Sequence, residues 1–428
     1  MTRSALFVTL AAMLLSLWLA AGPTSAATPE SAPLDDGSVL VRFVDGLPDE
    51  QVRIQLAAAG LRAVRRIPHI DVWVAQPLVA ATDTAATLGQ LDASTAVLWA
   101  EENGRVTAQD TLPDDPRYAE QWPLPLIGAP GAWDLAHGMT APIAIVDSGL
   151  DLDHGDLQAK LWRNVDEVAN NGLDDDGNGY VDDVFGYDLV DGDGWPQDEY
   201  GHGSHVGSIA GAAANNALGV AGVAWDTPLM VVRVLNATGE GNTADLAEGI
   251  LYAADQGAPI INLSLGYPIP SSAVKAAVDY ALDQGCLLVA AVGNQDGTVR
   301  FPAKLDGVLG VSATTSADTV WDQSNQGPEV DLAAPGEAVL GCNHLGGWVL
   351  KTGTSMAAPH VSAVAALVWG LRPELSSAQV VDILLSTAVD IGDEGADEYS
   401  GAGRVSAVAA VEKAVCRYRH ALPLVARH

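Results

Sequence analysis

From Pro142 onward, short apolar runs alternate with segments of helical periodicity, and this alternation restricts the fold more than any other feature of the sequence. Apolar runs without polar interruptions are typical of strands buried on both faces, and helices between them supply the crossover connections of a parallel sheet. We therefore predict an α/β domain whose parallel sheet is covered by helices on both faces. The predicted strands are 143–146, 229–234, 260–263, 287–291 and 308–311, and the predicted helices are 205–214, 244–256 and 271–284.

Residues 1–27 have the layout of a secretory signal peptide, with Arg3 ahead of an apolar run and small residues at 24–27. A membrane anchor is the alternative, because the run is about long enough to span a bilayer. The small residues favour cleavage, so we expect a secreted, extracellular protein that has no membrane attachment once the signal is removed. The apolar segment 356–371 is too short to span a bilayer and is interrupted by Pro359.

Residues 28–110 predict a separate small domain, because strand and helix patterns alternate there in the order of an α+β unit of the split βαβ type. The predicted strands are 38–43, 70–74 and 97–101, and the predicted helices are 49–59 and 84–91. Prolines and aspartates then cluster within 106–117, which is typical of an exposed boundary. We expect a second domain at 111–415 and a short tail at 416–428.

Acidic residues outnumber basic ones by 54 to 21, which gives a formal net charge of −33. This charge repels nucleic acid and anionic membranes and attracts divalent cations, so we expect no nucleic-acid partner. The cysteines Cys286, Cys342 and Cys416 allow at most one disulfide within the chain, and no metal-site spacing links them. We expect a monomer.

The segment LDDDGNGYVDD, residues 173–183, places oxygen ligands on alternate residues around a glycine turn. Such an arrangement suits Ca²⁺, which takes six to eight hard oxygen ligands. It resembles the first part of an EF-hand loop, but Phe185 stands where the EF-hand glutamate is expected. A solvated acidic loop without metal is the alternative, although neighbouring carboxylates repel one another. The predicted ligands are Asp174, Asp176, Asn178, the Tyr180 carbonyl and Asp182 or Asp183.

Side chains suited to acyl transfer lie at the ends of three predicted elements. Asp147 ends the first strand of the second domain, His202 and His205 open a helix, and Ser355 lies where a glycine-containing loop enters an apolar helix. Alone, these are a turn residue, structural histidines and a helix N-cap. Together they supply a nucleophile, a base and a carboxylate that orients the base, which a serine hydroxyl needs at neutral pH. Spacing alone does not choose between the two histidines.

Asn294 follows a further buried strand and a glycine in LLVAAVGNQDG. Its amide can donate a hydrogen bond to an oxyanion that forms beside Ser355, where the helix N-terminus also favours negative charge. An ordinary turn residue is the alternative reading of Asn294.

The motifs VDSGLDLDHGDL, HGSHVGSIAG and GTSMAAPHVS, in this order, resemble those of the subtilisin family of serine proteases, and the resemblance covers about residues 115–411. It implies that Asp147 orients the base, that His202 is the general base and acid, and that Ser355 attacks the scissile carbonyl. Asn294 and the Ser355 N–H would form the oxyanion hole. Ser204 stands where the family commonly has threonine.

The resemblance also implies how substrate binds. Ser264, Leu265 and Gly266 would pair with the substrate backbone as an added strand. Val292 stands where alanine is common and would narrow the pocket for the residue before the cut. We expect an endopeptidase for protein or peptide substrates, with a broad and mostly apolar preference.

Two further expectations follow from the resemblance. The region 36–107 would be an inhibitory propeptide that assists folding, blocks the active site as an intramolecular inhibitor and is removed near 109–113; an independent binding domain is the alternative. A second calcium site would follow the first motif and the histidine helix. Its ligands would be the side chains of Asp156 and Asn216, the carbonyls of Ala214, Leu218 and Val220, and Asp115.

We therefore expect a secreted, autoprocessed and calcium-stabilised serine endopeptidase that forms an acyl-enzyme on Ser355. A secreted calcium-binding module that keeps the fold without activity is the alternative from another class, and an esterase with the same triad is a third reading.

Overall fold

The computed structural model describes residues 38–79, 84–103 and 111–419. The chain divides into two compact units, Met1–Gln109 and Asp110–His428, and each is described by itself. The predicted signal peptide lies outside the described residues, as do residues 420–428 of the predicted tail. The last helix extends through Arg419, four residues into that tail.

The first unit is a four-stranded antiparallel sheet with the strand order β2-β3-β1-β4. Its elements are β1 (Val39–Phe43), α1 (Asp49–Ala58), β2 (Leu61–Ile67), β3 (Val72–Pro77), α2 (Thr84–Asp92) and β4 (Val97–Glu102). Val41, Phe43, Leu56 and Trp73 form its small core. The split βαβ prediction is confirmed, with one strand that the sequence pattern did not predict.

The unpredicted strand is β2, whose sequence LRAVRRI has no clear alternation of apolar and polar residues. Only Leu61 is buried in it, and the side chains of Arg62, Arg65 and Arg66 are exposed. The strand lies at the edge of the sheet and pairs with β3, with a register shift between Ala63 and Arg65. Such a shift breaks the two-residue period on which strand prediction depends.

The second unit is built on a seven-stranded parallel sheet with the order β11-β10-β9-β8-β5-β7-β6. Its strands are β5 (Ile143–Asp147), β6 (Gly186–Asp188), β7 (Leu229–Arg233), β8 (Ile260–Leu263), β9 (Leu287–Ala291), β10 (Val308–Thr314) and β11 (Leu332–Pro335). All five predicted strands are present. The sequence pattern missed β6 and β11, which have only three and four residues.

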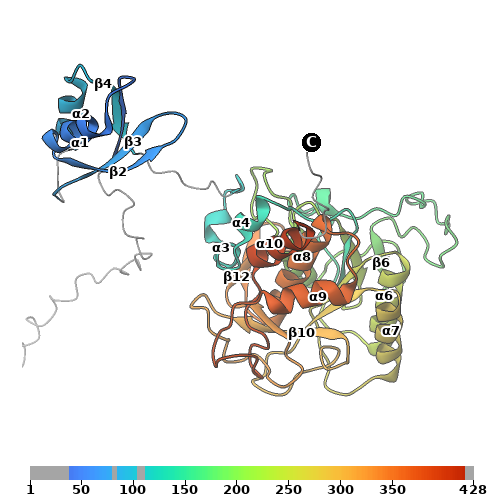
Figure 1. The fold of residues 1–428 in the computed structure, drawn as a ribbon. Coiled ribbons are helices and arrows are strands. Elements are labelled where there is room, and N and C mark those ends of the chain that lie inside the picture. Colours follow the sequence, from blue (N-terminus) through green and yellow to red (C-terminus); the bar gives the residue numbers. More distant parts are fainter. Residues whose placement is uncertain (1–37, 80–83, 104–110, 420–428) are drawn as a thin grey trace, which may run out of the picture. The chain divides into compact units, whose positions relative to one another are not determined.

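Helices cover both faces of this sheet (Figure 1). They are α3 (Pro123–Leu126), α4 (Ala129–Trp133), α5 (Gly203–Gly211), α6 (Thr243–Asp255), α7 (Ser272–Asp283), α8 (Thr354–Leu371), α9 (Ser377–Ser386) and α10 (Ala407–Arg419), with 3-10 turns at Tyr118–Glu120 and Gln158–Lys160. A two-stranded hairpin, β12 (Val339–Cys342) and β13 (Trp348–Lys351), lies apart from the main sheet.

Alternate residues of β5 show how the two layers of helices are anchored. Ile143 and Ile145 belong to one hydrophobic core with α5 and α8, whereas Ala144 and Val146 belong to a second core with α6 and α7. Successive side chains of a strand point to opposite faces, so a sheet buried on both faces needs a continuous apolar run. The predicted α/β class is confirmed.

Among the described residues, one helix is long and apolar enough to cross a membrane. This is α8, whose apolar window is 83% buried. It packs against α5 and the sheet in the first of the two cores, so its apolar surface is that of a central core helix.

Candidate active site and metal centres

Asp147 and His202 form the central polar pair of the second unit. Asp147 is the last residue of β5 and is fully buried, and His202 immediately precedes α5. The distance between His202 Nδ1 and Asp147 Oδ1 is 2.7 Å. A carboxylate on Nδ1 holds the proton there and leaves Nε2 free to accept one, which is the tautomer that a general base needs.

His205 occupies a different environment. It is fully buried, and its Nε2 lies 3.0 Å from the Val339 carbonyl and 3.1 Å from the Val349 carbonyl. Burial lowers the pKa of His205 to about 3. The neutral ring therefore donates from Nε2 to the carbonyls of the β12–β13 hairpin, and of the two histidines only His202 is paired with a carboxylate.

Ser355 is the second residue of α8 and is 9% exposed. Its Oγ donates to the Ser264 carbonyl at 2.8 Å, and Ser264 Oγ donates to the Ser355 carbonyl at 2.8 Å. No hydrogen bond joins Ser355 to His202 in the part of the chain that the structure describes. Such catalytic hydrogen bonds are often long or poorly aligned without substrate and tighten when substrate binds.

Asn294 is fixed by the residue that precedes Ser355. Its Oδ1 accepts hydrogen bonds from Thr354 N and Thr354 Oγ1, both at 2.8 Å. Because both bonds use the oxygen, the Asn294 Nδ2 group remains a donor beside the start of α8. The first backbone N–H groups of that helix have no intrahelical acceptor, so Ser355 N–H and Asn294 Nδ2 supply two donors near Ser355 Oγ.

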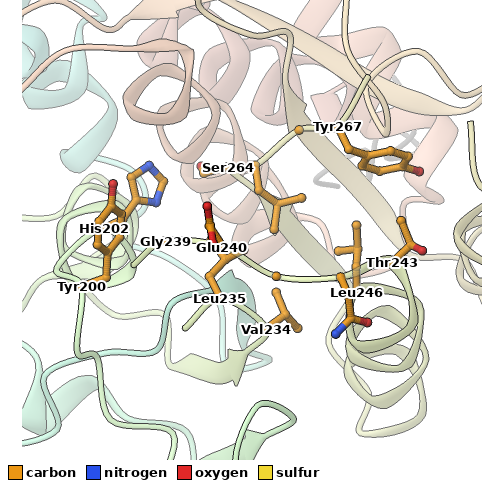
Figure 2. Close-up of a pocket in the computed structure, with 14 residues that line it drawn as sticks. Tyr200, His202, Val234, Leu235, Gly239, Glu240, Thr243, Leu246, Ser264 and Tyr267 are labelled. Carbon is orange, nitrogen blue, oxygen red and sulfur yellow. The ribbon is translucent and has the colours of Figure 1, made fainter. Parts of the chain in front are cut away.

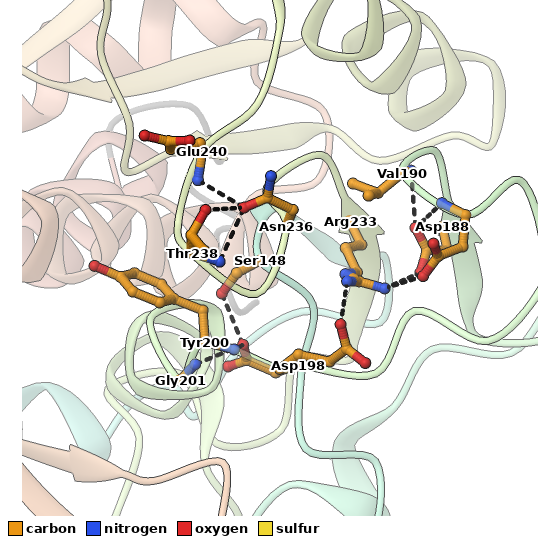
Figure 3. Close-up of polar contacts among 12 residues, drawn as sticks. Ser148, Asp188, Val190, Asp198, Tyr200, Gly201, Arg233, Asn236, Thr238 and Glu240 are labelled. Carbon is orange, nitrogen blue, oxygen red and sulfur yellow. Dashed lines mark hydrogen bonds and ion pairs between the residues drawn. The ribbon is translucent and has the colours of Figure 1, made fainter.

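Asp198 also belongs to this site, although the sequence analysis did not single it out. It is 2% exposed and accepts hydrogen bonds from Ser148 Oγ at 2.8 Å and Gly201 N at 2.7 Å (Figure 3). It also accepts from Ser204 Oγ at 2.6 Å. It thereby joins the residue after Asp147 to the residues on both sides of His202. The only sequence signal is its position four residues before His202.

A cavity of about 580 Å³ opens beside His202 (Figure 2). Ser264, Leu265 and Gly266, predicted to bind the substrate backbone, all line it. Ser355 is not among the lining residues, but it is joined to the lining residue Ser264 by two hydrogen bonds. Val292 is fully buried in the second hydrophobic core and is not among the lining residues.

The sequence matches known proteins over most of its second unit. Residues 138–403 match the sequence profile of peptidase S8, the subtilase family. The chain belongs to the subtilase family. Thermitase from Thermoactinomyces vulgaris is 37% identical over 302 residues, which cover 70% of this chain and 99% of thermitase. Halolysin from Haloferax mediterranei is 41% identical over 329 residues, which cover 74% of this chain and 57% of halolysin.

A solved structure supports the same conclusion. The protease from Pseudoalteromonas arctica superposes with a TM-score of 0.60 at 31% identity, covering 71% of this chain and 100% of that one. This subtilase therefore shares its fold with serine proteases, and the predicted family is confirmed.

The segment 148–201, the acidic insertion, separates Asp147 from His202 and contains the LDDDGNGYVDD motif. Two of its predicted calcium ligands make other contacts. The Asp174 carboxylate accepts hydrogen bonds from the N–H groups of Gly177 and Gly179, and Asp182 accepts from those of Asn171 and Gly172. These hydrogen bonds join each of the two carboxylates to the backbone of its own loop.

A different set of carboxylates in the insertion converges. One oxygen of each of Glu167, Asp176 and Asp183 lies within 4.8 Å of the others. Asn164 Nδ2 bridges Asp176 and Asp183 at 2.9 and 2.8 Å. Asn178, another predicted ligand, contacts the same two carboxylates through Nδ2. No cation balances this cluster among the described residues, and burial raises the pKa of Asp183.

Glu167 supplies the atom that best fits a metal. Its Oε1 accepts a hydrogen bond from Asp175 N, whereas its Oε2 is buried and has no hydrogen-bond partner among the described residues. Glu167 itself is 8% exposed. Three carboxylates with a free buried oxygen match the ligands of Ca²⁺. Glu167 lies outside the LDDDGNGYVDD motif, so motif spacing could not identify it.

The structure also brings together several residues of the second predicted calcium site. Asp156 accepts hydrogen bonds from Asn216 Nδ2 at 3.1 Å, Val220 N at 3.0 Å and Trp348 Nε1 at 2.8 Å. These bonds join Asp156 to the loop at 214–220, which contains the predicted carbonyl ligands Ala214 and Leu218.

Asp115 contacts the same loop, because its Oδ2 accepts from Asn215 N at 2.9 Å. Its Oδ1 is buried and has no partner among the described residues, and burial raises the pKa of Asp115. A hard cation would satisfy that oxygen, so the donor set fits Ca²⁺ here as well.

Proposed function

We propose that this subtilase is a secreted serine endopeptidase that hydrolyses peptide bonds through an acyl-enzyme on Ser355, and that it is made as an autoprocessed, calcium-stabilised precursor. The observation that carries the proposal is the 2.7 Å contact between His202 Nδ1 and Asp147 Oδ1 beside a cavity lined by Ser264, whose carbonyl accepts a hydrogen bond from Ser355 Oγ. A relative from Natrialba magadii, 36% identical, is described as a halolysin-like extracellular serine protease, which supports the secreted location.

The proposed reaction begins when Ser355 Oγ leaves the Ser264 carbonyl and attacks the scissile carbonyl carbon. His202 Nε2 takes the hydroxyl proton, and Asp147 stabilises the imidazolium that results. Asn294 Nδ2 and Ser355 N–H donate to the developing oxyanion. His202 then gives its proton to the leaving amine. Water, deprotonated by His202, releases the acid and regenerates Ser355.

The first unit would serve as the propeptide. It would assist folding, inhibit the active site and be removed near residues 109–113. Its compact four-stranded fold and its separation from the second unit along the chain support this assignment.

Calcium would have a structural role at both acidic centres. Glu167, Asp176 and Asp183 would hold one ion, and Asp115 with the 214–220 loop would hold another. Bound Ca²⁺ would neutralise the repulsion among carboxylates that otherwise lack cationic partners. Asp156 already accepts three hydrogen bonds, so it would orient the second loop whether or not an ion is bound.

Labelling with a fluorophosphonate probe tests the proposal directly, because the probe forms an adduct only with an activated serine. The calcium-loaded mature protein should carry one adduct on Ser355 in peptide mass spectrometry, and Ser355→Ala should carry none. Absence of the adduct would favour the inactive calcium-binding module. Purified Ser355→Ala should also keep residues 28–110, and loss of that segment would contradict autoprocessing.

A further inference from the structure

One charge stands out in the cavity beside His202. Its walls contain no lysine or arginine, and Glu240 is the only acidic residue among the lining side chains. Figure 2 shows Glu240 on the segment that follows Leu235, with Thr243 and Leu246 farther along the same wall. A side chain that enters the cavity therefore meets one carboxylate and no opposing cation from the walls.

The backbone holds Glu240 in place, but its carboxylate has no partner. Glu240 N donates to Asn236 Oδ1 at 3.1 Å, and Asn236 N donates to the Glu240 carbonyl at 2.8 Å. These bonds fix the tight turn that carries the residue. Within the described residues, the Glu240 carboxylate makes no hydrogen bond or ion pair.

Nearby carboxylates differ from Glu240 in this respect. Glu199 binds Arg233 at 2.6 Å, and Asp245 accepts from Asn242 Nδ2 at 2.6 Å. Lys351 is engaged elsewhere, because its ammonium donates to the Gly201 carbonyl at 2.6 Å. Glu240 is thus the unpaired carboxylate at the mouth of the cavity.

Apolar side chains form part of the wall. Val234 is 1% exposed and Leu246 is 4% exposed, and Leu235 and Tyr267 complete the lining on this side. Arginine and lysine combine an alkyl stem that packs on apolar surface with a cationic end group. Their stems fit the partly exposed side chains of Leu235 and Tyr267, and their end groups fit the carboxylate of Glu240.

We propose that Glu240 selects substrates that present an arginine or lysine side chain to this cavity while the scissile carbonyl lies at Ser355. This inference rests on the proposed endopeptidase function and narrows its expected, mostly apolar preference at one substrate position. The effect is moderate because Glu240 is exposed. Ion pairs at exposed sites contribute about 0.2–1 kcal/mol, which corresponds to about a 1.5- to 5-fold preference.

Internally quenched peptides test the proposal. Arginine, norleucine or glutamate is placed at each position on either side of one cleaved bond, and kcat/KM is measured for each peptide. At one position the arginine peptide should be cleaved about 2- to 5-fold faster than the norleucine peptide, and the glutamate peptide more slowly than both. The preference should weaken as NaCl is raised, because salt screens exposed charges.

Glu240→Gln should remove the preference for arginine and leave kcat/KM for the norleucine peptide within about twofold of the unmodified protein, since only a rim charge is lost. Glu240→Lys should reverse the preference, so that kcat/KM is higher for the glutamate peptide than for the arginine peptide. Glu394→Gln removes the same charge from an exposed site outside the cavity and should leave the preference unchanged. Equal ratios in Glu240→Gln and the unmodified protein would overturn the inference.

The outcome separates this inference from the proposed function. Fluorophosphonate labelling of Ser355 reports on the catalytic machinery and does not depend on Glu240. If the protein does not cleave peptides, anisotropy of the same peptides carrying a fluorophore measures their binding to it. Tighter binding of the arginine peptide that Glu240→Gln abolishes would support the inference without catalysis, and equal binding of all three peptides would overturn it.

Discussion

At the scale of single residues, the buried carboxylate of Asp198 shows how the candidate base is held. His202 contacts Asp147 directly. The residues on either side of His202 are held by Asp198, which accepts hydrogen bonds from Gly201 N and Ser204 Oγ. Ser148 completes the link back to the end of β5. Such a network rigidifies a site when every member is satisfied and is costly when one acceptor is lost.

Asp198→Asn should therefore impair both stability and reactivity. The amide keeps the size of the side chain but replaces one acceptor oxygen with a donor that faces N–H or O–H groups. Leaving buried donors unsatisfied costs about 1–3 kcal/mol, and displacement of His202 should slow fluorophosphonate labelling about tenfold or more. Thermal denaturation and labelling rates measure the two effects.

Asp393→Asn is the matched control for this experiment, because Asp393 is exposed and the change removes the same charge. Its labelling rate should equal that of the unmodified protein. An unchanged rate in Asp198→Asn would show that the network does not position His202.

At the scale of elements, the acidic insertion is anchored to the sheet at a defined point. Strand β6 of the insertion pairs with β7. Arg233 at the end of β7 binds Asp188 at 2.5 Å (Figure 3) and Glu199 at 2.6 Å. Arg233 and Asp188 are both buried, so the ion pair between them is screened little by solvent. The converging carboxylates of Glu167, Asp176 and Asp183 lie between β5 and this anchor in the sequence.

Glu167→Gln should have opposite effects with and without calcium. In a chelator, the variant should be at least as stable as the unmodified protein, because one of three mutually repelling carboxylates is gone. In calcium it should be less stable, because an ion at about 100 times its Kd stabilises the native state by about 2.7 kcal/mol. Thermal midpoints in calcium and in chelator measure the difference.

Glu398→Gln, which changes an exposed glutamate outside the insertion, should shift neither midpoint. If the calcium-dependent shift of Glu167→Gln equals that of the unmodified protein, Glu167 is not a ligand. If chelation leaves the midpoint of the unmodified protein unchanged, both calcium proposals are wrong.

At the scale of the whole molecule, two buried histidines make the free energy of unfolding depend on pH. Burial lowers the pKa of His205 to about 3 and that of His360 to about 4, whereas an exposed histidine in the unfolded chain has a pKa of about 6.5. The unfolded state therefore binds more protons below pH 6.5, and stability falls as the pH decreases from 6.5 toward 4.

We expect the free energy of unfolding to fall by about 1.4 kcal/mol for each of these histidines between neutral pH and pH 5.5. Denaturant unfolding at a series of pH values measures the slope. His360→Leu should remove about half of the pH-dependent loss, whatever its effect on stability at neutral pH. A free energy that is constant between pH 7 and 5.5 would contradict the prediction.

The sequence by itself determined the parallel sheet, because strands buried on both faces need continuous apolar runs and these runs are local. It also made Asp147, His202 and Ser355 candidates, because each lies at the end of an element within a motif that resembles those of the family, although spacing alone left His205 open as well. It missed β2, where exposed arginines and a register shift hide the period of two, and β6 and β11, which are too short to show one.

Only the tertiary structure decided which groups meet. Two histidines three positions apart look alike in sequence, yet His202 contacts a carboxylate and His205 contacts two backbone carbonyls. Likewise, Asp174 and Asp182 fit a calcium motif and accept hydrogen bonds from backbone N–H groups of their own loop, whereas Asp176 and Asp183 converge with Glu167, which has a buried oxygen without a partner among the described residues. Motif spacing gives the order of oxygen atoms along a chain, whereas hydrogen bonding and burial decide which of them remain available.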